Sequence, residues 1–323
     1  MKKQTKIAAV LSAAAFMMMV SGLPVYAASY GWVTEGDAKV YYDEDGYLTT
    51  DAWRKRGEDW FYLGEDGQIV KSAKIDEYYV DDEGKMVTNA WVELKNEEDP
   101  DSPETPDTFW YYFEKDGKSA VSKWVKFDSK WYYFDESGHM ATGKTEIDGA
   151  TYYLGTEKDG FMRTGWIRLE ENSHAPGASE SWYYFNSDGK MVTTQYDKKI
   201  DGSYYTFIDG KMQTGWVLMP SKSDVTDSNA ASPKITDYQY YGAAGDGKRA
   251  EGFRSIEGIS GIHAADEVYT FYFKAGKPYV SDKKGNSLFT INAKKYAFSD
   301  LGIMQTGRQI ANVANDEIAN FYF

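Results

Sequence analysis

The stretch Ser122–Gly143 reads SKWVKFDSKWYYFDESGHMATG, and the same order of features recurs along the chain. Trp124 is followed seven residues later by Trp131, which opens a Trp-Tyr-Tyr-Phe run. An acidic turn that ends in Gly138 then leads through Met140 to a Thr-Gly pair. Repetition of such a unit predicts an array, because each unit buries its apolar face only by stacking on its neighbours.

Each unit is predicted to be one β-hairpin. The aromatic runs are short, rich in strand-forming residues and bounded by Asp, Asn and Gly, which is typical of a strand that leads into a tight turn. The segment before each run supplies the partner strand. A lone hairpin is marginally stable in water, so we expect an all-β solenoid of stacked β-hairpin repeats. Twelve runs are found, at 40–42, 60–62, 77–79, 110–113, 131–134, 151–154, 182–185, 203–205, 239–241, 270–273, 295–298 and 321–323.

Residues 1–27 are predicted to be a secretory signal peptide, since early lysines precede an apolar segment and a small-residue cleavage site. No other apolar run approaches the roughly 20 residues that span a bilayer. We therefore expect a secreted protein without a membrane span, held at the cell wall or cell surface. Residues 28–216 carry the regular repeats, and 217–323 are predicted to be degenerate C-terminal repeats, the last of them incomplete.

Three longer polar stretches, at 96–108, 170–180 and 220–233, lie between the two strands of a unit. We expect them to be long hairpin tips and not linkers between domains. Lengthening a surface loop costs little, about 0.6 kcal/mol for each doubling of its length. The strand register is therefore expected to survive these insertions.

The charge and the residue types exclude several classes of function. Without the three lysines of the signal peptide, 33 basic and 50 acidic residues remain, a formal charge of −17. Such a surface repels nucleic acid and anionic lipid, which are bound chiefly by Lys and Arg. The chain has no cysteine, so disulfides and thiolate metal sites are excluded. We expect no catalytic residues, no metal and no cofactor, because the Asp-rich turns lack the EF-hand spacing and the three histidines fall in turns and loops.

Paired tryptophans are the candidate binding residues. In each pair one indole stands on the first strand and one on the second, and direct opposition across the hairpin would place their Cβ atoms about 4.5 to 5.5 Å apart. A tyrosine from the next hairpin would then complete an aromatic cage, which binds a quaternary ammonium by cation–π attraction. The pairs are Trp53 with Trp60, Trp91 with Trp110, Trp124 with Trp131, and Trp166 with Trp182, and the candidate third walls are Tyr79, Tyr133, Tyr153 and Tyr205.

The order Gly-Trp, Trp-Tyr-Tyr-Phe, Asp-Gly-x-Met and Thr-Gly, as at 164–166 and 181–191, resembles the cell-wall-binding repeats of Gram-positive choline-binding proteins. The resemblance implies a left-handed β-solenoid whose grooves bind choline on teichoic acids. Similar repeats in glucan-binding domains and clostridial toxins imply carbohydrate instead. Three interpretations stay open: a choline-binding wall protein, a module for glucan or host glycan, and the targeting region of a longer wall hydrolase.

The chain departs from the repeat pattern in several hairpins. Lys74 and Lys144 stand where a first-strand tryptophan is expected, and Phe253 replaces the indole of a Gly-Trp pair. No tryptophan follows Trp216. We therefore expect the ligand grooves between Trp53 and Tyr205, with a mainly structural C-terminal third. The paired tyrosines of the runs are interpreted mainly as core residues.

Overall fold

The computed structural model describes residues 30–96, 106–170, 179–220, 232–243, 245–264, 266–312 and 318–323. These residues form two compact units. Unit 1 runs up to Lys123 and includes Phe134–Met140, while unit 2 comprises Trp124–Tyr133 and Ala141–Phe323. The predicted signal peptide at 1–27 and most of the three long tips lie outside the described residues.

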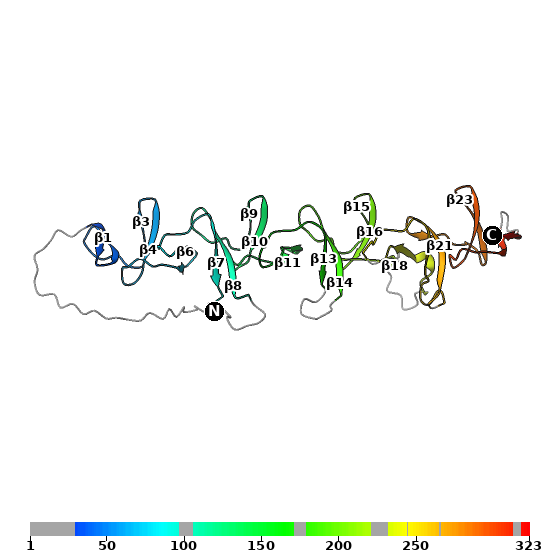
Figure 1. Cartoon of the computed structure of the whole chain (residues 1–323), viewed down its shortest axis with the longest axis horizontal. Helices are drawn as coiled ribbons and strands as arrows, with labels where there is room; N and C mark the ends of the chain where they lie inside the picture. The colour runs from blue at the N-terminus through cyan, green and yellow to red at the C-terminus, as the bar shows by residue number, and fades with distance from the viewer. Residues whose placement is uncertain are drawn as a thin grey trace, which may run out of the picture. The chain divides into compact units, whose positions relative to one another are not determined.

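Almost all regular structure is β-strand, as the sequence predicts (Figure 1). One 3₁₀ turn, η1 (Ile235–Asp237), is the single helical element among the described residues. The strands are β1 Gly31–Glu35, β2 Ala38–Tyr42, β3 Ala52–Arg56, β4 Asp59–Leu63, β5 Ala73–Ile75, β6 Tyr78–Val80, β7 Ala90–Lys95, β8 Thr108–Phe113, β9 Lys123–Phe127, β10 Lys130–Phe134, β11 Lys144–Ile147, β12 Ala150–Tyr153, β13 Gly165–Glu170, β14 Glu180–Phe185, β15 Gln195–Ile200, β16 Ser203–Ile208, β17 Lys211–Met212, β18 Gly215–Leu218, β19 Tyr238–Tyr241, β20 Gly252–Glu257, β21 Val268–Lys274, β22 Lys277–Pro278, β23 Asn286–Ile291, β24 Lys294–Ser299, β25 Arg308–Asn312 and β26 Ile318–Tyr322.

Twelve antiparallel hairpins follow one another in the described part of the chain, one for each predicted unit. They are β1–β2, β3–β4, β5–β6, β7–β8, β9–β10, β11–β12, β13–β14, β15–β16, β18–β19, β20–β21, β23–β24 and β25–β26. The hairpins β7–β8, β13–β14 and β18–β19 pair on either side of the three long stretches, so these stretches lie within hairpins as predicted.

In several hairpins an aspartate and a glycine set the turn that follows the second strand. In the turn that follows β10, the Asp135 carboxylate accepts hydrogen bonds from the backbone N–H groups of Ser137 and His139 at 2.9 and 2.8 Å. Gly138 has φ of 82°, in the left-handed region that glycine adopts without steric cost. Asp43 and Asp81 accept the same pair of bonds in their own turns. The acidic turns are therefore local folding signals.

The core is built mainly from side chains at one repeated position, which lies at or beside the end of the second strand of a hairpin. Full burial of an aromatic or large aliphatic side chain contributes about 1.5 to 3 kcal/mol. Ten such side chains have no exposed surface: Leu63, Val80, Phe113, Phe134, Leu154, Phe185, Phe207, Tyr241, Phe273 and Phe298. The Phe that closes each Trp-Tyr-Tyr-Phe run is thus the central core residue, and the tyrosines surround it.

Neighbouring hairpins are joined by one recurring backbone bond. The N–H of a residue in the turn after one hairpin donates to a carbonyl on the second strand of the hairpin before it. Met86 donates to Trp60, Met162 to Trp131 and Met191 to Thr151, each at 2.8 Å. These three hairpins are therefore joined to their predecessors by main-chain hydrogen bonds as well as by buried side chains.

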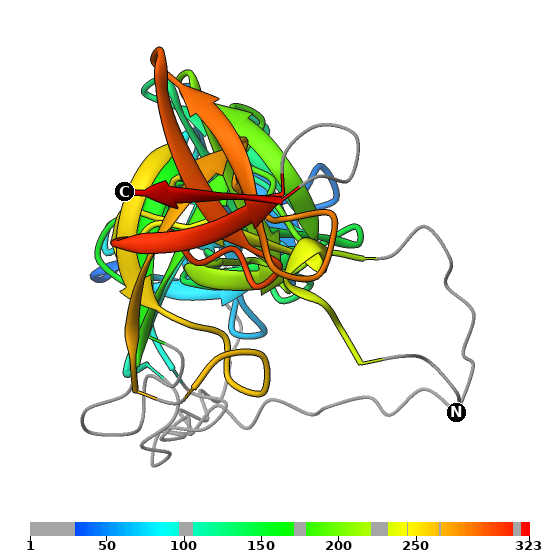
Figure 2. The ribbon, with the colours of Figure 1, turned by 90° about the vertical axis from the view of Figure 1, so that its right-hand side faces the viewer.

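The C-terminal hairpins depart from this simple scheme. β23 pairs in parallel with β25, which gives a four-stranded sheet in the order β24-β23-β25-β26. Figure 2 shows the C-terminal strands, in orange and red, nearest the viewer. β17 and β22 each add a third strand to the hairpin before them. In the described part of the chain, no helix has the length and apolar character needed to cross a membrane.

Two histidines are buried, contrary to the expectation of solvated loop residues. His139 stacks face to face on Phe109 with ring centroids 3.7 Å apart. His263 accepts a bond from the Ile259 N–H through Nδ1 and donates from Nε2 to the Leu301 carbonyl, at 2.8 and 2.9 Å. Both serve packing, and His174 lies outside the described residues.

Candidate functional site

The first-strand tryptophan of a hairpin lies opposite a tyrosine. In β3–β4 the register pairs Trp53 with Tyr62 and Lys55 with Trp60. Direct opposition of Trp53 and Trp60 was therefore a wrong prediction. The two-residue turn between these strands falls at Gly57 and Glu58, which pairs Arg56 with Asp59. A turn one residue earlier would have paired Trp53 with Trp60, so the two indoles are diagonal neighbours instead.

The long tips leave this register unchanged, as predicted. Trp91 lies opposite Tyr112, and Trp166 lies opposite Tyr184. In each case the two rings meet nearly edge to face, with centroids 5.3 and 5.1 Å apart. Trp124 makes the same contact with Tyr133 at 5.3 Å.

A third ring comes from the following hairpin. Tyr78 lies 5.3 Å from Trp53, Tyr152 lies 4.9 Å from Trp124, and Tyr205 lies 4.8 Å from Trp166, all between ring centroids. The first-strand ring, the tyrosine opposite it and the ring from the next hairpin are called here an aromatic set.

The expected third walls are corrected in two hairpins. Tyr79 lies opposite Lys74 and stacks on Phe113. Tyr153 lies opposite Lys144. In these two hairpins the wall is the first tyrosine of the pair, Tyr78 or Tyr152, since strand alternation turns the second one away. Tyr205 contacts Trp166 as predicted. Tyr133 contacts Trp124 as the cross-strand ring of its own hairpin. Within unit 1, Phe134 of the next hairpin contacts Trp91.

The second-strand tryptophans form a further wall in two hairpins. Trp110 lies 6.5 Å from Trp91 at an angle of 73°, and Trp182 lies 6.4 Å from Trp166 at 83°. Two nearly perpendicular indoles form the corner of a box. Trp60 and Trp131 are each 41% exposed, and Lys126 Nζ lies 5.7 Å from the centroid of the Trp131 ring.

Three aromatic sets were missed in the sequence. Trp32 contacts Tyr41 and Phe61, Trp216 contacts Tyr240 and Phe271, and Phe253 contacts Tyr272 and Tyr296, with centroids 4.8 to 5.8 Å apart. The signal was present, because a glycine directly precedes each first-strand ring. The geometry of the sets therefore continues into the C-terminal third, which was expected to be mainly structural.

Two tyrosines of the sets, Tyr62 and Tyr240, have raised pKa values and are neutral phenols at neutral pH. Burial, with nearby Asp51 and Asp76, raises the pKa of Tyr62. Burial likewise raises the pKa of Tyr240. A neutral ring presents the negative face of its quadrupole, which attracts a cation. The sets can therefore hold an ammonium group but offer no acid, base or nucleophile.

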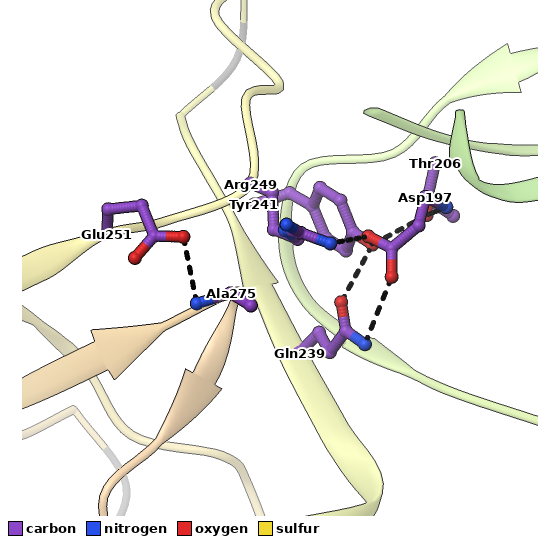
Figure 3. A network of polar contacts seen from close by, with 7 residues as sticks. All are labelled: Asp197, Thr206, Gln239, Tyr241, Arg249, Glu251 and Ala275. Atoms are coloured by element: carbon purple, nitrogen blue, oxygen red, sulfur yellow. Dashed lines mark hydrogen bonds and ion pairs between the residues drawn. The ribbon is translucent and has the colours of Figure 1, made fainter. Parts of the chain in front are cut away.

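A buried polar cluster takes the place of an aromatic set at β15–β16 (Figure 3). Asp197 Oδ1 accepts a hydrogen bond from the Tyr241 hydroxyl at 2.9 Å and faces Arg249 Nη1 at 2.9 Å. The Tyr241 oxygen in turn accepts from Thr206 Oγ1 at 2.7 Å. Gln239 donates to the other Asp197 oxygen at 3.4 Å. Burial is the main cause that raises the pKa of Tyr241.

Residues 121–166 match the family model of the choline-binding repeat, and residues 178–191 match that of the cell wall binding repeat. Two stretches of this chain thus match models of repeat families. The resemblance seen in the sequence is thereby confirmed, and the first match covers the aromatic set of Trp124.

Two curated relatives are glucosyltransferases. Glucosyltransferase-S of Streptococcus mutans serotype c is 28% identical over 193 residues, which cover 54% of this chain and 10% of that protein. Glucosyltransferase-I of Streptococcus downei is 26% identical over 310 residues, which cover 85% of this chain and 17% of that protein. This chain thus spans far less than two thirds of the length of either relative.

Among solved structures, CbpJ of Streptococcus pneumoniae TIGR4 is similar to this chain with a TM-score of 0.52 and 20% identity. The similarity covers 89% of this chain and 97% of that one. At this identity the likeness concerns the fold alone. It agrees with an all-β chain of successive hairpins.

Proposed function

We propose that this protein is a non-catalytic, exported cell-wall-binding protein whose aromatic sets hold the choline groups of teichoic acid. The recurring aromatic set carries the proposal. In seven hairpins the centroid of the first-strand ring lies 4.8 to 5.8 Å from that of a cross-strand tyrosine and from that of a ring of the next hairpin. The choline-binding repeat match over 121–166 supports the same ligand class.

The arrangement suits a quaternary ammonium because methyl groups pack on ring faces while the positive charge faces several quadrupoles. Each ring contributes about 0.5 to 2 kcal/mol, depending on how far the cation is desolvated. The best candidates are the sets of Trp91 and Trp166, where a second indole stands nearly perpendicular to the first. Of the twelve residues named from the sequence, ten stay candidates for this role, while Tyr78 and Tyr152 replace Tyr79 and Tyr153 as walls.

Repetition supplies avidity. A wall polymer that presents choline at regular intervals engages several weak sites at once, and linked sites can exceed one site by 10² to 10⁴ in affinity. We infer that the hairpins of each unit follow one another as turns of a β-solenoid. The bonds from Met86 to Trp60 and from Met162 to Trp131, which join only successive hairpins, support this inference.

A second candidate function is binding of carbohydrate, as glucan or host glycan. The two glucosyltransferase relatives favour it, since proteins named for glucose transfer carry a segment similar to most of this chain. Aromatic faces also stack on sugar rings. The targeting region of a longer wall hydrolase is a third arrangement in which the same sets would act.

One chromatographic experiment separates the ligands. The protein is loaded on an immobilised quaternary amine in about 1 M salt, where the Debye length falls to about 3 Å and the net charge no longer holds it. Retention followed by elution with free choline is expected. Passage straight through the column would contradict the choline proposal. Retention on dextran without any response to choline would favour the carbohydrate function.

A further inference from the structure

In several repeats a methionine side chain fills a slot against the turn glycine of the next hairpin. Met86 lies against Gly117, and Met191 lies against Gly210, where an added Cβ would come within 2.7 to 2.8 Å of the methionine. Each of these methionines also bonds through its N–H to the second strand of the preceding hairpin. The slot is thus fixed by a backbone bond on one side and a glycine on the other.

Arg249 occupies the same slot in unit 2. Its N–H donates to the Tyr204 carbonyl at 2.8 Å, and its Cγ lies 2.7 Å from the position that a Cβ on Gly276 would take. Tyr204 accordingly stands at the strand position that Trp60 and Trp131 hold in their hairpins. A guanidinium therefore replaces the thioether beside an aromatic wall.

The guanidinium completes a cation site with components from three segments. Its Cζ lies 4.1 Å from the centroid of the Tyr204 ring, well inside the range of a cation–π contact. Its Nη1 lies 2.9 Å from Asp197 Oδ1, and the Arg249 side chain is 16% exposed. The Asp197 carboxylate also receives the Tyr241 hydroxyl and the Gln239 amide (Figure 3). The site thus offers a ring face and a partly buried carboxylate, 30% exposed, to one planar cation.

Two other hairpins show the arrangement in a more exposed form. Lys74 and Lys144 take the place of a first-strand tryptophan, and each ammonium lies over a ring of the next hairpin. Lys74 Nζ is 4.7 Å from the Tyr111 centroid, and Lys144 Nζ is 5.3 Å from the Tyr183 centroid. Where the indole is lost, the chain supplies a cation of its own.

We propose that the hairpin β15–β16 carries a cation-binding site that the chain's own Arg249 occupies. When the guanidinium of Arg249 is removed, this site accepts a small free guanidinium ion. The internal cation links β15–β16 to the turn after β19. If the open aromatic sets bind choline as proposed above, the Tyr204 ring of this hairpin holds an internal cation instead, while Tyr205 still serves the set of Trp166. The occupancy of the site by Arg249 does not depend on that ligand.

Chemical rescue tests the proposal with the full-length chain. Arg249→Met restores the thioether that the chain uses in other slots and removes the guanidinium, so Asp197 and Tyr204 lose their cation. We expect the variant to melt at a lower temperature than the wild type. Tens of millimolar methylguanidinium should then raise its melting temperature by about 2 to 5 °C, because a ligand that binds only the folded state stabilises it. The same concentration should leave the wild type unchanged.

Controls separate a specific site from a general salt effect. Urea, planar but uncharged, should give no rise in Arg249→Met, and the added change Asp197→Asn should abolish the rescue. Arg168→Met is the matched arginine control, since Arg168 pairs with Glu180 at the surface and is 56% exposed. Equal responses in Arg168→Met and Arg249→Met, or no response in Arg249→Met, would overturn the proposal.

A second pair of variants decides the matter if Arg249→Met does not fold. Tyr204→Trp keeps the ring face and should preserve the melting temperature, because indole is the better cation–π partner. Tyr204→Leu keeps an apolar side chain without the ring face and should lower the melting temperature by several degrees. Equal melting temperatures for the two variants would overturn the proposal.

Discussion

The indole of Trp166 and the phenol ring of Tyr205 lie 4.8 Å apart between centroids, at an angle of 63°, although they belong to successive hairpins. Strand pairing cannot create this contact, since β13 pairs only with β14 and β15 with β16. The contact exists because one hairpin stacks on the next. An aromatic set is thus a property of two hairpins together.

Tyr205→Leu is expected to weaken choline binding at this set. Leucine keeps an apolar side chain at a buried position but removes the ring face, so the loss should be about 0.5 to 2 kcal/mol, or about 2- to 30-fold in the site's affinity. Calorimetric titration with choline would measure it. Tyr47→Leu is the matched control, because Tyr47 is 72% exposed. Unchanged binding in Tyr205→Leu would return Tyr205 to a purely structural role.

Trp124→Ala and Trp131→Ala are expected to differ in stability while both reduce choline-induced quenching of tryptophan fluorescence. Trp124 packs against the core cluster of Ile147, Tyr152 and Leu154. Its loss should cost about 3 to 5 kcal/mol, as for other large-to-small core changes. Trp131 is 41% exposed and should cost much less. Thermal denaturation monitored by circular dichroism would show the difference, and similar melting temperatures would contradict the packing assigned to Trp124.

Phe185→Ala is expected to destabilise unit 2 strongly. Phe185 closes its Trp-Tyr-Tyr-Phe run and has no exposed surface, so truncation should cost about 3 to 5 kcal/mol. Phe127→Ala, at a position 38% exposed, provides the comparison and should cost under about 1 kcal/mol. Urea denaturation of both variants would measure the two values. Equal losses would argue against a core centred on the closing phenylalanine.

The stability of the fold is expected to fall above about pH 10, in part because of Tyr241. Burial raises the pKa of this phenol in the folded chain, while in the unfolded chain it ionises near pH 10. The contribution is therefore fully present below pH 10 and is lost as the pH rises toward the folded-state pKa. One proton gives a slope of up to about 1.4 kcal/mol per pH unit.

Tyr241→Phe tests this dependence. The variant should be less stable at pH 8, because Thr206, Gln239 and Asp197 lose a hydrogen-bond partner. Between pH 10 and 11 its free energy of unfolding should fall less steeply than that of the wild type. Parallel slopes in urea denaturation at these pH values would show that Tyr241 does not carry the effect.

The sequence by itself determined the number and place of the hairpins. Strand-forming runs such as 131–134 and Asp-Gly turns such as the one ending at Gly138 act over a few residues, so their signal is local and survives in every repeat. The repeat family was recognisable for the same reason. The glycine before Trp216 and before Phe253 would also have identified two further aromatic sets.

Tertiary structure decided which rings meet. The two-residue turn at Gly57 placed Trp53 opposite Tyr62 instead of Trp60, and the stacking of hairpins selected Tyr78 over Tyr79 as the third wall. Strand alternation defines two faces but does not say which face the next hairpin covers. The cation site of Arg249 is the clearest case, since Asp197, Tyr204 and Arg249 carry no local signal and come together only when successive hairpins pack.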